Sequence, residues 1–232
     1  IIFAQWIGPI NGKFAQILVK NLLKCCSYVS VRDENSYNLL KSWNIEAELV
    51  CDPIYSIAIP SVETKNIVGI QLRDYKTMNY NLLTKLAEQV VIEFSDRKIE
   101  IFSFQNSIDL DTCKKFEGIL KALNPDIETE IISAKPLKET VERLAKLEYL
   151  IAMRFHAVLV ALMAGVKTCA INYDIKVEKL ASEAKIPLIS MNAEENFQNI
   201  FNELENLNKN DLTKFAQSKH FDWTNFENII NS

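Results

Sequence analysis

Residues 148–165, which read EYLIAMRFHAVLVALMAG, are the stretch that decides the fold of this chain. The apolar run over 148–153 predicts a buried strand, and residues 156–165 predict a helix that follows it directly. Nearly continuous apolar strands are typical of parallel sheets whose two faces are covered by helices. Arg154 and His156 stand where the strand passes into the helix. The stretch therefore predicts an α/β fold with polar side chains at the carboxyl end of a parallel strand.

The same alternation of strand and helix continues on both sides of this stretch. Before it, strands are expected over 1–5, 27–32 and 46–50, with helices over 12–24 and 34–43. Further strands fit 66–72, 98–104, 127–133, 167–172 and 187–191. Further helices fit 79–94, 110–123, 137–147, 175–185 and 194–206, and residues 210–231 fit one or two amphipathic helices. This order predicts two doubly wound, Rossmann-like parallel sheets.

Pro60 and the polar residues after it mark a domain boundary. We expect residues 1–58 to be the C-terminal part of an incomplete Rossmann-like domain and residues 64–206 to be a second such domain. Residues 207–232 are then C-terminal helices that can pack back on the first domain. The chain opens with IIFAQWIGPI, without an initiator Met or the basic segment of a signal peptide. We therefore expect further residues before residue 1 in the natural protein.

Composition excludes several classes of protein. The 232 residues are 48% hydrophobic and 24% charged, which is typical of a globular chain. The net charge of −4 argues against nucleic acid as a partner, and no apolar run is long enough to span a membrane. The five glycines form neither a dinucleotide-binding motif nor a P-loop, and the five cysteines fit no zinc template. We expect a cytoplasmic chain without metal or cofactor.

Polar side chains follow the predicted strands, at the edge where open α/β sheets bind ligands. Three of them are Arg32, Arg73 and Arg154. A guanidinium group matches phosphate and carboxylate bidentately, so the three arginines together predict an anion site. The alternative is that each arginine pairs with a neighbouring aspartate at the rim of its sheet. The other side chains expected to line the cleft are Asp33, Gln105, Tyr173, Asp174 and Lys176.

His156 stands near the start of a predicted helix that no Ser, Thr, Asp or Asn caps. The first N–H groups of such a helix are available to an anionic ligand, and the helix dipole favours one there. A histidine in this place can act as general acid or base near neutral pH. The alternative is a histidine that only caps the helix or fills a polar pocket. For Asp33 and Asp174, the position in the sequence predicts the N-caps of the following helices.

Seven segments occur in the order of the polysaccharide pyruvyl transferase family and resemble the CsaB-type bacterial cell-wall enzymes most closely. They are AQWIGPI (4–10), SVRDENSYNLL (30–40), CDP (51–53), GIQLRD (69–74), FSFQNSID (102–109), MRFHAVLVALMAGV (153–166) and INYDIKVEKLA (171–181). The resemblance covers residues 1–190. Two features depart from the family pattern: the usual Gly-rich strand–turn–helix at the N-terminus is absent, and Trp6 stands where the family has Gly. The resemblance therefore implies a chain that lacks the first part of the usual sequence.

The resemblance implies two Rossmann-like domains in a GT-B-like arrangement. It also implies transfer of pyruvate from phosphoenolpyruvate to two hydroxyls of a sugar, which gives a cyclic ketal. The implied acceptor is an N-acetylmannosamine-type sugar of a lipid-linked or polymeric cell-wall precursor. Such an acceptor would bring the chain to the inner face of the membrane as a peripheral contact.

The resemblance also implies roles for individual residues. Arg32 and the segment Arg154, Phe155 and His156 match positions tied to donor binding and catalysis, and Arg73 is a weaker match. We expect His156 to be the general acid, with the arginines neutralising the anionic donor. Asp33 or Asp174 would orient a neighbour or accept a hydroxyl proton.

Two other functions compete with this prediction. One is a GT-B-like glycosyltransferase that uses a sugar nucleotide, because a helix N-terminus beside a basic residue would also hold a diphosphate. The other is a non-catalytic module that binds a glycan. The fold alone does not separate them, since such folds host many activities. The donor separates them, because a pyruvyl transferase binds phosphoenolpyruvate, a glycosyltransferase binds a sugar nucleotide, and a glycan-binding module binds neither.

Overall fold

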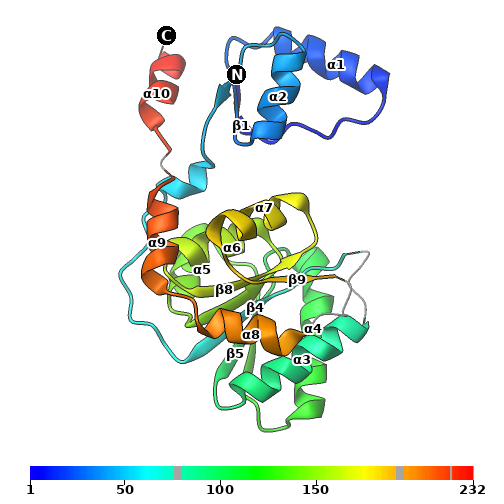
Figure 1. Ribbon diagram of the computed structural model, residues 1–232, viewed down its shortest axis with the longest axis vertical. Coiled ribbons are helices and arrows are strands. Elements are labelled where there is room, and N and C mark those ends of the chain that lie inside the picture. Colours follow the sequence, from blue (N-terminus) through cyan, green and yellow to red (C-terminus); the bar gives the residue numbers. More distant parts are fainter. Residues whose placement is uncertain (76–79, 192–195, 220, 232) are drawn as a thin grey trace. The chain divides into compact units, whose positions relative to one another are not determined.

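A computed structural model of the chain describes all residues except 76–79, 192–195, 220 and 232 (Figure 1). The chain divides into two compact units, Ile1–Ile57 with Ser218–Ser232, and Ala58–Gln217. Each unit has its own parallel sheet, one of three strands and one of six. The predicted α/β class is therefore confirmed, while the GT-B-like arrangement of the two parts stays a prediction.

The first unit is built on a sheet of strand order β1-β2-β3. Its elements are β1 (Ile2–Gln5), α1 (Lys13–Lys24), β2 (Val29–Val31), α2 (Glu34–Ser42), β3 (Glu48–Leu49), the 3-10 helix η1 (Pro53–Ser56) and α10 (Trp223–Asn231). One buried hydrophobic cluster of this unit consists of Leu23, Val29, Val31, Leu40 and Ile45, and Ala4 and Phe221 are buried as well. Aromatic contacts join β1 to α10 and to the residues just before it, since the ring centre of Phe3 lies 3.9 Å from that of Phe226 and 5.3 Å from that of Phe221.

The second unit is a six-stranded sheet of order β6-β5-β4-β7-β8-β9. Its elements are β4 (Ile67–Gln71), α3 (Tyr80–Phe94), β5 (Lys98–Phe102), α4 (Asn106–Leu123), β6 (Thr129–Ile132), α5 (Leu137–Ala145), β7 (Tyr149–Ala152), α6 (Phe155–Met163), β8 (Lys167–Asn172), α7 (Ile175–Ala184), β9 (Leu188–Ser190), α8 (Phe197–Glu205) and α9 (Lys209–Gln217). All neighbouring strands are parallel. The order of the strands along the chain reverses between β4 and β7, which makes this place the topological switch point.

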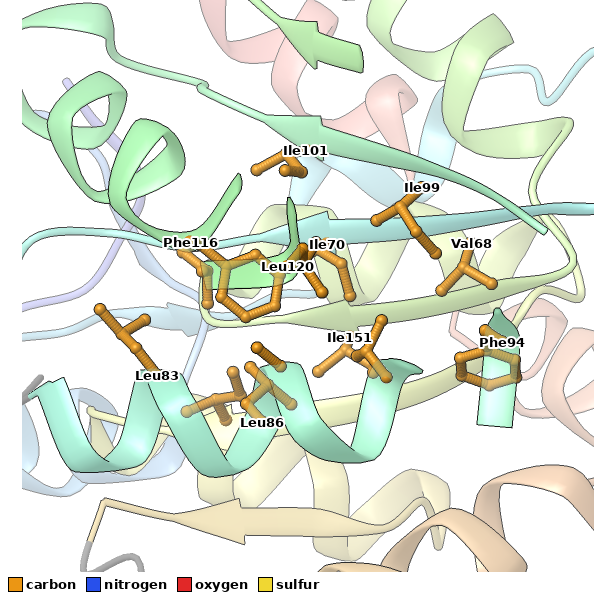
Figure 2. Packing of buried hydrophobic residues seen from close by; sticks show 14 of the residues in the cluster. Val68, Ile70, Leu83, Leu86, Phe94, Ile99, Ile101, Phe116, Leu120 and Ile151 are labelled. Atoms are coloured by element: carbon orange, nitrogen blue, oxygen red, sulfur yellow. The ribbon is translucent and has the colours of Figure 1, made fainter. Parts of the chain in front are cut away.

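Helices cover both faces of the six-stranded sheet (Figure 1). Helices α3, α4 and α8 lie on one face, α5, α6 and α7 lie on the other, and α9 packs against α6. Apolar side chains form the core under α3 and α4: Leu86, Phe116 and Leu120 meet Ile70 and Ile99 of the central strands (Figure 2). Burial on both faces explains why these strands read as continuous apolar runs.

The predicted elements of the second unit are present, and the largest difference at their ends is the start of α4. Helix α4 was predicted over 110–123 and begins at Asn106 instead. The reason is Asp109, whose carboxylate accepts the backbone N–H groups of Phe104 and Gln105 and so turns the chain four residues earlier. Residue 79 and residues 194–195, the predicted starts of two other helices, lie outside the described residues. The predicted segment 210–231 forms two helices, α9 with the second unit and α10 with the first.

Candidate functional site at the carboxyl edge of the six-stranded sheet

The buried side chain of Gln71 ties together the ends of β4 and β7, the two strands that flank the switch point. Its backbone carbonyl accepts the N–H of Met153 at 3.0 Å, and its side-chain Oε1 accepts the N–H of Arg154 at 2.8 Å. Its Nε2 donates to the carbonyl of Leu72 at 2.9 Å. The amide thus uses both of its ends, and it is completely buried. The residues that follow the two strands are therefore held in a defined place relative to each other.

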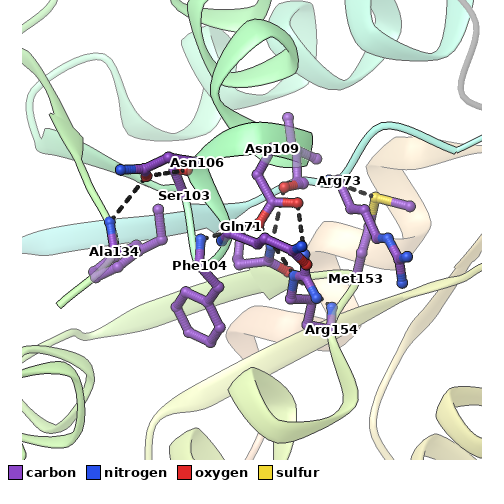
Figure 3. A network of polar contacts seen from close by, with 12 residues as sticks. Gln71, Arg73, Ser103, Phe104, Asn106, Asp109, Ala134, Met153 and Arg154 are labelled. Atoms are coloured by element: carbon purple, nitrogen blue, oxygen red, sulfur yellow. Dashed lines mark hydrogen bonds and ion pairs between the residues drawn. The ribbon is translucent and has the colours of Figure 1, made fainter. Parts of the chain in front are cut away.

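Arg154 stands at the N-cap of α6 and pairs with Asp109 of α4 (Figure 3). Its Nε donates to Oδ2 at 3.1 Å and its Nη2 to Oδ1 at 2.7 Å. The side chain of Asp109 is completely buried, whereas that of Arg154 is 19% exposed. This is the pairing that the alternative interpretation of the arginines predicted, and it fixes the plane of the guanidinium group.

Asp109 was part of the motif at 102–109 but was not predicted as a site residue. Its Oδ2 also accepts the N–H groups of Phe104 at 3.0 Å and of Gln105 at 2.9 Å. Sequence separation explains the omission, because Asp109 and Arg154 are 45 residues apart and only the fold brings them together. A weak signal was present, since an aspartate in the first turn of a helix is a common partner of backbone N–H groups.

Arg73 follows β4 and has no carboxylate partner among the residues that the structure describes. Its backbone N–H lies 3.2 Å from Met153 Sδ, and its guanidinium carbon lies 5.7 Å from the centre of the Tyr173 ring. The Nε of Arg73 is buried without a hydrogen-bond partner. The Tyr173 ring also meets Tyr75 edge-on, with 5.2 Å between ring centres. Of the three arginines that were expected to form an anion site, Arg73 is therefore the one whose charge no carboxylate of the described residues neutralises.

His156 is the second residue of α6, and no side chain caps this helix. The imidazole is exposed, and the ring of Phe155 lies beside it with 5.4 Å between ring centres. The helix behind it is firmly anchored, since every residue from Ala157 to Leu162 is buried. The prediction that no Ser, Thr, Asp or Asn caps this helix is confirmed, since the N-cap residue is Arg154 and its side chain makes no capping hydrogen bond.

The remaining predicted side chains of the second unit have local tasks. Asp174 is the N-cap of α7, as predicted, and accepts the backbone N–H of Lys176 at 3.0 Å. Gln105 is exposed and stands at the N-cap position of α4 without a capping hydrogen bond from its side chain. Tyr173 lies over Arg73 at the end of β8. Of this group, Tyr173 is the side chain that the fold brings to an arginine.

In the first unit, Arg32 and Asp33 follow β2. Arg32 forms an ion pair with the buried Asp52, which again is the pairing of the alternative interpretation. Asp33 is buried and caps α2, as predicted, by accepting the N–H of Ser36 at 2.8 Å. The Ser36 hydroxyl also contacts the Asp33 carboxylate, and a buried, fully engaged carboxylate is poorly placed to accept a proton from a sugar hydroxyl. A cavity of about 400 Å³ opens beside Arg32, lined also by Ala4, Gln5 and Trp223.

Cys113 lies one turn beyond Asp109 on α4. Burial, followed by the nearby Asp109 carboxylate, raises the pKa of its thiol from the usual 9.0 to about 12. The thiol is therefore protonated at neutral pH and is not a nucleophile there. Among the described residues, no three His, Cys, Asp or Glu side chains are grouped as metal ligands would be. No helix in the described ranges is long and apolar enough to cross a membrane.

Solved structures with a similar fold include several enzymes and accessory secretory proteins. The accessory secretory protein 1, 2 and 3 structure from Streptococcus pneumoniae matches at a TM-score of 0.60 and 15% identity, over 93% of this chain and 45% of that chain. The UDP-GlcNAc 2-epimerase from Methanocaldococcus jannaschii matches at a TM-score of 0.59 and 13% identity, over 88% of this chain and 64% of that chain. A mutant of TarM from S. aureus matches at a TM-score of 0.54 and 15% identity, over 89% of this chain and 42% of that chain. At such low identity the likeness concerns the fold alone, and the chain spans about half the length of these proteins.

The sequence comparison adds the family to the fold. No curated protein matches this chain. Residues 1–175, which carry Arg32, Arg73, Asp109 and the Arg154–His156 segment, match the sequence model of the family described as polysaccharide pyruvyl transferase. That range covers the first unit up to α10 and the switch point of the second. The chain belongs to the polysaccharide pyruvyl transferase family.

Proposed function

We propose that this chain transfers pyruvate from phosphoenolpyruvate to two hydroxyls of a sugar and forms a cyclic ketal. The observation that carries the proposal is the exposed His156 on the uncapped first turn of α6, next to Arg154 and at the switch point of the sheet. An acid or base at a helix start that binds anions is what this reaction requires. Family membership supports the same chemistry.

Phosphoenolpyruvate brings a phosphate and a carboxylate to the site, and the basic groups there suit both. Arg73 offers an open guanidinium beside Tyr173, and Arg154 keeps N–H groups that Asp109 does not use. The first N–H groups of α6 add an anion-binding helix end. We assign the donor to these three elements, with Phe155 beside them. Arg32 was predicted to share this task, and its role stays a prediction.

The reaction then needs one proton donor and two additions at the same carbon. His156 would donate a proton to the methylene carbon of phosphoenolpyruvate, which becomes the methyl group. The oxygen of the first sugar hydroxyl forms a bond to the neighbouring carbon and gives up its proton. Phosphate leaves with the electrons of its C–O bond, and the second hydroxyl closes the ring and gives up its proton in turn. One of the two hydroxyl protons restores the protonated His156, and the departing phosphate takes the other. The products are the ketal and inorganic phosphate, so atoms and charges balance.

The acceptor is assigned on the resemblance alone. We propose an N-acetylmannosamine-type sugar of a lipid-linked or polymeric cell-wall precursor. A chain acting on a lipid-linked sugar would work in the cytoplasm at the inner face of the membrane, as a peripheral contact.

Calorimetric titration of the chain with phosphoenolpyruvate tests the donor, with UDP- and CMP-sugars titrated in parallel. We expect phosphoenolpyruvate to bind and Arg73→Gln to weaken it by roughly tenfold or more, since a bidentate, charge-assisted contact is lost. Arg97→Gln is the matched control, because Arg97 pairs with Glu148 at the opposite edge of the same sheet. In an assay for phosphate release, His156→Gln should abolish turnover while phosphoenolpyruvate still binds. Unchanged turnover in this variant would refute the role of His156.

A sugar-nucleotide enzyme is the second candidate function. It is favoured by the likeness of the fold to enzymes whose structures hold UDP or UDP-GlcNAc, such as TarM and the UDP-GlcNAc 2-epimerases. Binding of a UDP- or CMP-sugar without binding of phosphoenolpyruvate would support this candidate. Binding of a glycan alone would support the non-catalytic module.

A further inference from the structure

We infer that Asp109 is a positioning residue, which turns the guanidinium group of Arg154 so that its open end faces the donor. The inference rests on the proposed function for the identity of the donor. Because Asp109 itself is completely buried, its effect on the donor would pass through Arg154. The role follows from three features of the pair: which N–H groups it uses, how firmly the carboxylate is held, and what remains of the charge.

The pair uses one edge of the guanidinium group and leaves the other open. Asp109 accepts from Nε and Nη2, which lie along one side of the planar group. A guanidinium group has five N–H donors, so both donors of Nη1 and the second donor of Nη2 remain. Among the described residues, no hydrogen bond or ion pair of Arg154 Nη1 is found. These remaining donors form a fork that can hold a phosphate or carboxylate bidentately.

The carboxylate that sets this orientation cannot rotate freely. Its Oδ2 accepts two backbone N–H groups at the start of α4 in addition to Arg154 Nε. On the other side, Gln71 holds the backbone N–H of Arg154. Arg154 is therefore tied at its backbone by β4 and at its guanidinium edge by α4, two elements of the same compact unit (Figure 3). A side chain held at both ends loses little entropy when it binds a ligand.

The pair also changes what Arg154 contributes to the site. Because Asp109 balances its charge, Arg154 supplies direction more than net positive charge, and the unpaired Arg73 supplies the charge. A lysine at position 154 could not serve the carboxylate and the donor at once, since an ammonium is a point charge without a second edge. Arg154 therefore serves to orient the donor, and Arg73 serves to neutralise its charge.

The first experiment measures the pair without any ligand. In the full ¹⁵N-labelled chain, the Nε–H signal of Arg154 is identified by its loss in Arg154→Lys. We expect it to exchange slowly with water in the natural chain and roughly tenfold faster or more in Asp109→Asn, where the buried carboxylate is gone. An unchanged exchange rate in a folded Asp109→Asn variant would overturn the inference.

The second experiment is a double-mutant cycle on the dissociation constant for phosphoenolpyruvate. We expect Asp109→Asn and Arg154→Gln each to weaken binding by roughly tenfold or more, and the double variant to be no weaker than Arg154→Gln alone. Losses that multiply would show that Asp109 acts independently of Arg154, as a merely structural residue would. Glu100→Gln is the matched control, because Glu100 is a buried carboxylate of the same sheet that pairs with Arg143 of α5. It should leave the dissociation constant unchanged.

Arg154→Lys covers the case in which Asp109→Asn does not fold. It keeps the positive charge beside Asp109, yet it should lose as much donor affinity as Arg154→Gln; retained affinity would overturn the inference. The arms also separate the two proposals. If the natural chain does not bind phosphoenolpyruvate, the proposed function fails, and the exchange rate of the Arg154 signal still decides whether Asp109 orients the guanidinium group.

Discussion

Asp109 influences two side chains from one buried position on α4. It holds the edge of Arg154 through two hydrogen bonds, and it stands close enough to Cys113 to oppose the formation of a second negative charge. Burial is the larger cause of the raised thiol pKa, and the carboxylate comes second. Burial and the carboxylate together keep the thiol of Cys113 protonated, which suits a site that is proposed to bind an anion rather than to use a thiolate.

The thiol of Cys113 makes stability depend on pH in the alkaline range. Its pKa is about 12 in the folded chain and near 9.0 when exposed, so the unfolded chain loses this proton first. The stabilising contribution is complete below pH 9 and falls as the pH rises from 9 toward 12. Urea unfolding at increasing pH should therefore show a smaller decline in Cys113→Ala than in the natural chain. Cys25→Ala removes an exposed cysteine instead and is the control; parallel declines in all three chains would contradict the assignment.

The side chains of Leu147 and Leu150 fill the space beside Gly69 of β4. A Cβ at Gly69 would lie 2.4 Å from Leu147 Cδ1 and 3.0 Å from Leu150 Cδ1, and both leucines are buried. Gly69→Ala should therefore lower the free energy of unfolding by about 1–3 kcal/mol, the usual cost of overpacking a core.

Gly118→Ala is the matched control. A Cβ at Gly118, on the exposed side of α4, would meet nothing within 4 Å, so this change should raise the free energy of unfolding by about 0.5–1 kcal/mol. Thermal unfolding of both variants measures the two changes in stability, which should have opposite signs. Equal effects would show that the space beside Gly69 can accept a Cβ.

At the level of elements, periodicity predicted most of what the structure contains. The strand at 149–152 and helix α6 follow from the pattern of 148–165, because both are buried and their apolar residues recur without interruption. The start of α4 does not follow from the pattern, because the side chain of Asp109 inside the helix accepts the N–H groups of the two residues that precede it, Phe104 and Gln105.

The candidate site was predictable only in part. The strand-end rule predicts that Arg73, Arg154 and His156 stand at one edge of a parallel sheet, and they do. It does not say which arginine meets a carboxylate, because Asp109 and Asp52 reach their partners through tertiary structure. Only the structure shows that Arg32 and Arg154 form ion pairs with aspartates, whereas Arg73 forms none with the described residues. In the sequence the three arginines look equivalent.

As a whole, the molecule consists of two units with very different cores. The second unit buries long apolar strands between two helix layers, whereas the first has the small core of Leu23, Val29, Val31, Leu40 and Ile45. On α1, the residues with helical spacing Phe14, Ile17, Leu18 and Leu22 form a face that is 51–81% exposed. A small core stabilises a unit less, because the buried apolar area must offset the entropy of the ordered chain.

The first unit should therefore unfold before the second. The tryptophans provide a selective probe, because Trp6, Trp43 and Trp223 all belong to the first unit. Far-UV circular dichroism is dominated by the second unit, which holds most of the helices and strands. In a urea titration we expect the fluorescence transition at a lower midpoint than the dichroism transition, which is the behaviour of two units of unequal stability. Coincident transitions would show instead that the two units unfold as one cooperative body, and the small core of the first would then have to be stabilised from outside itself.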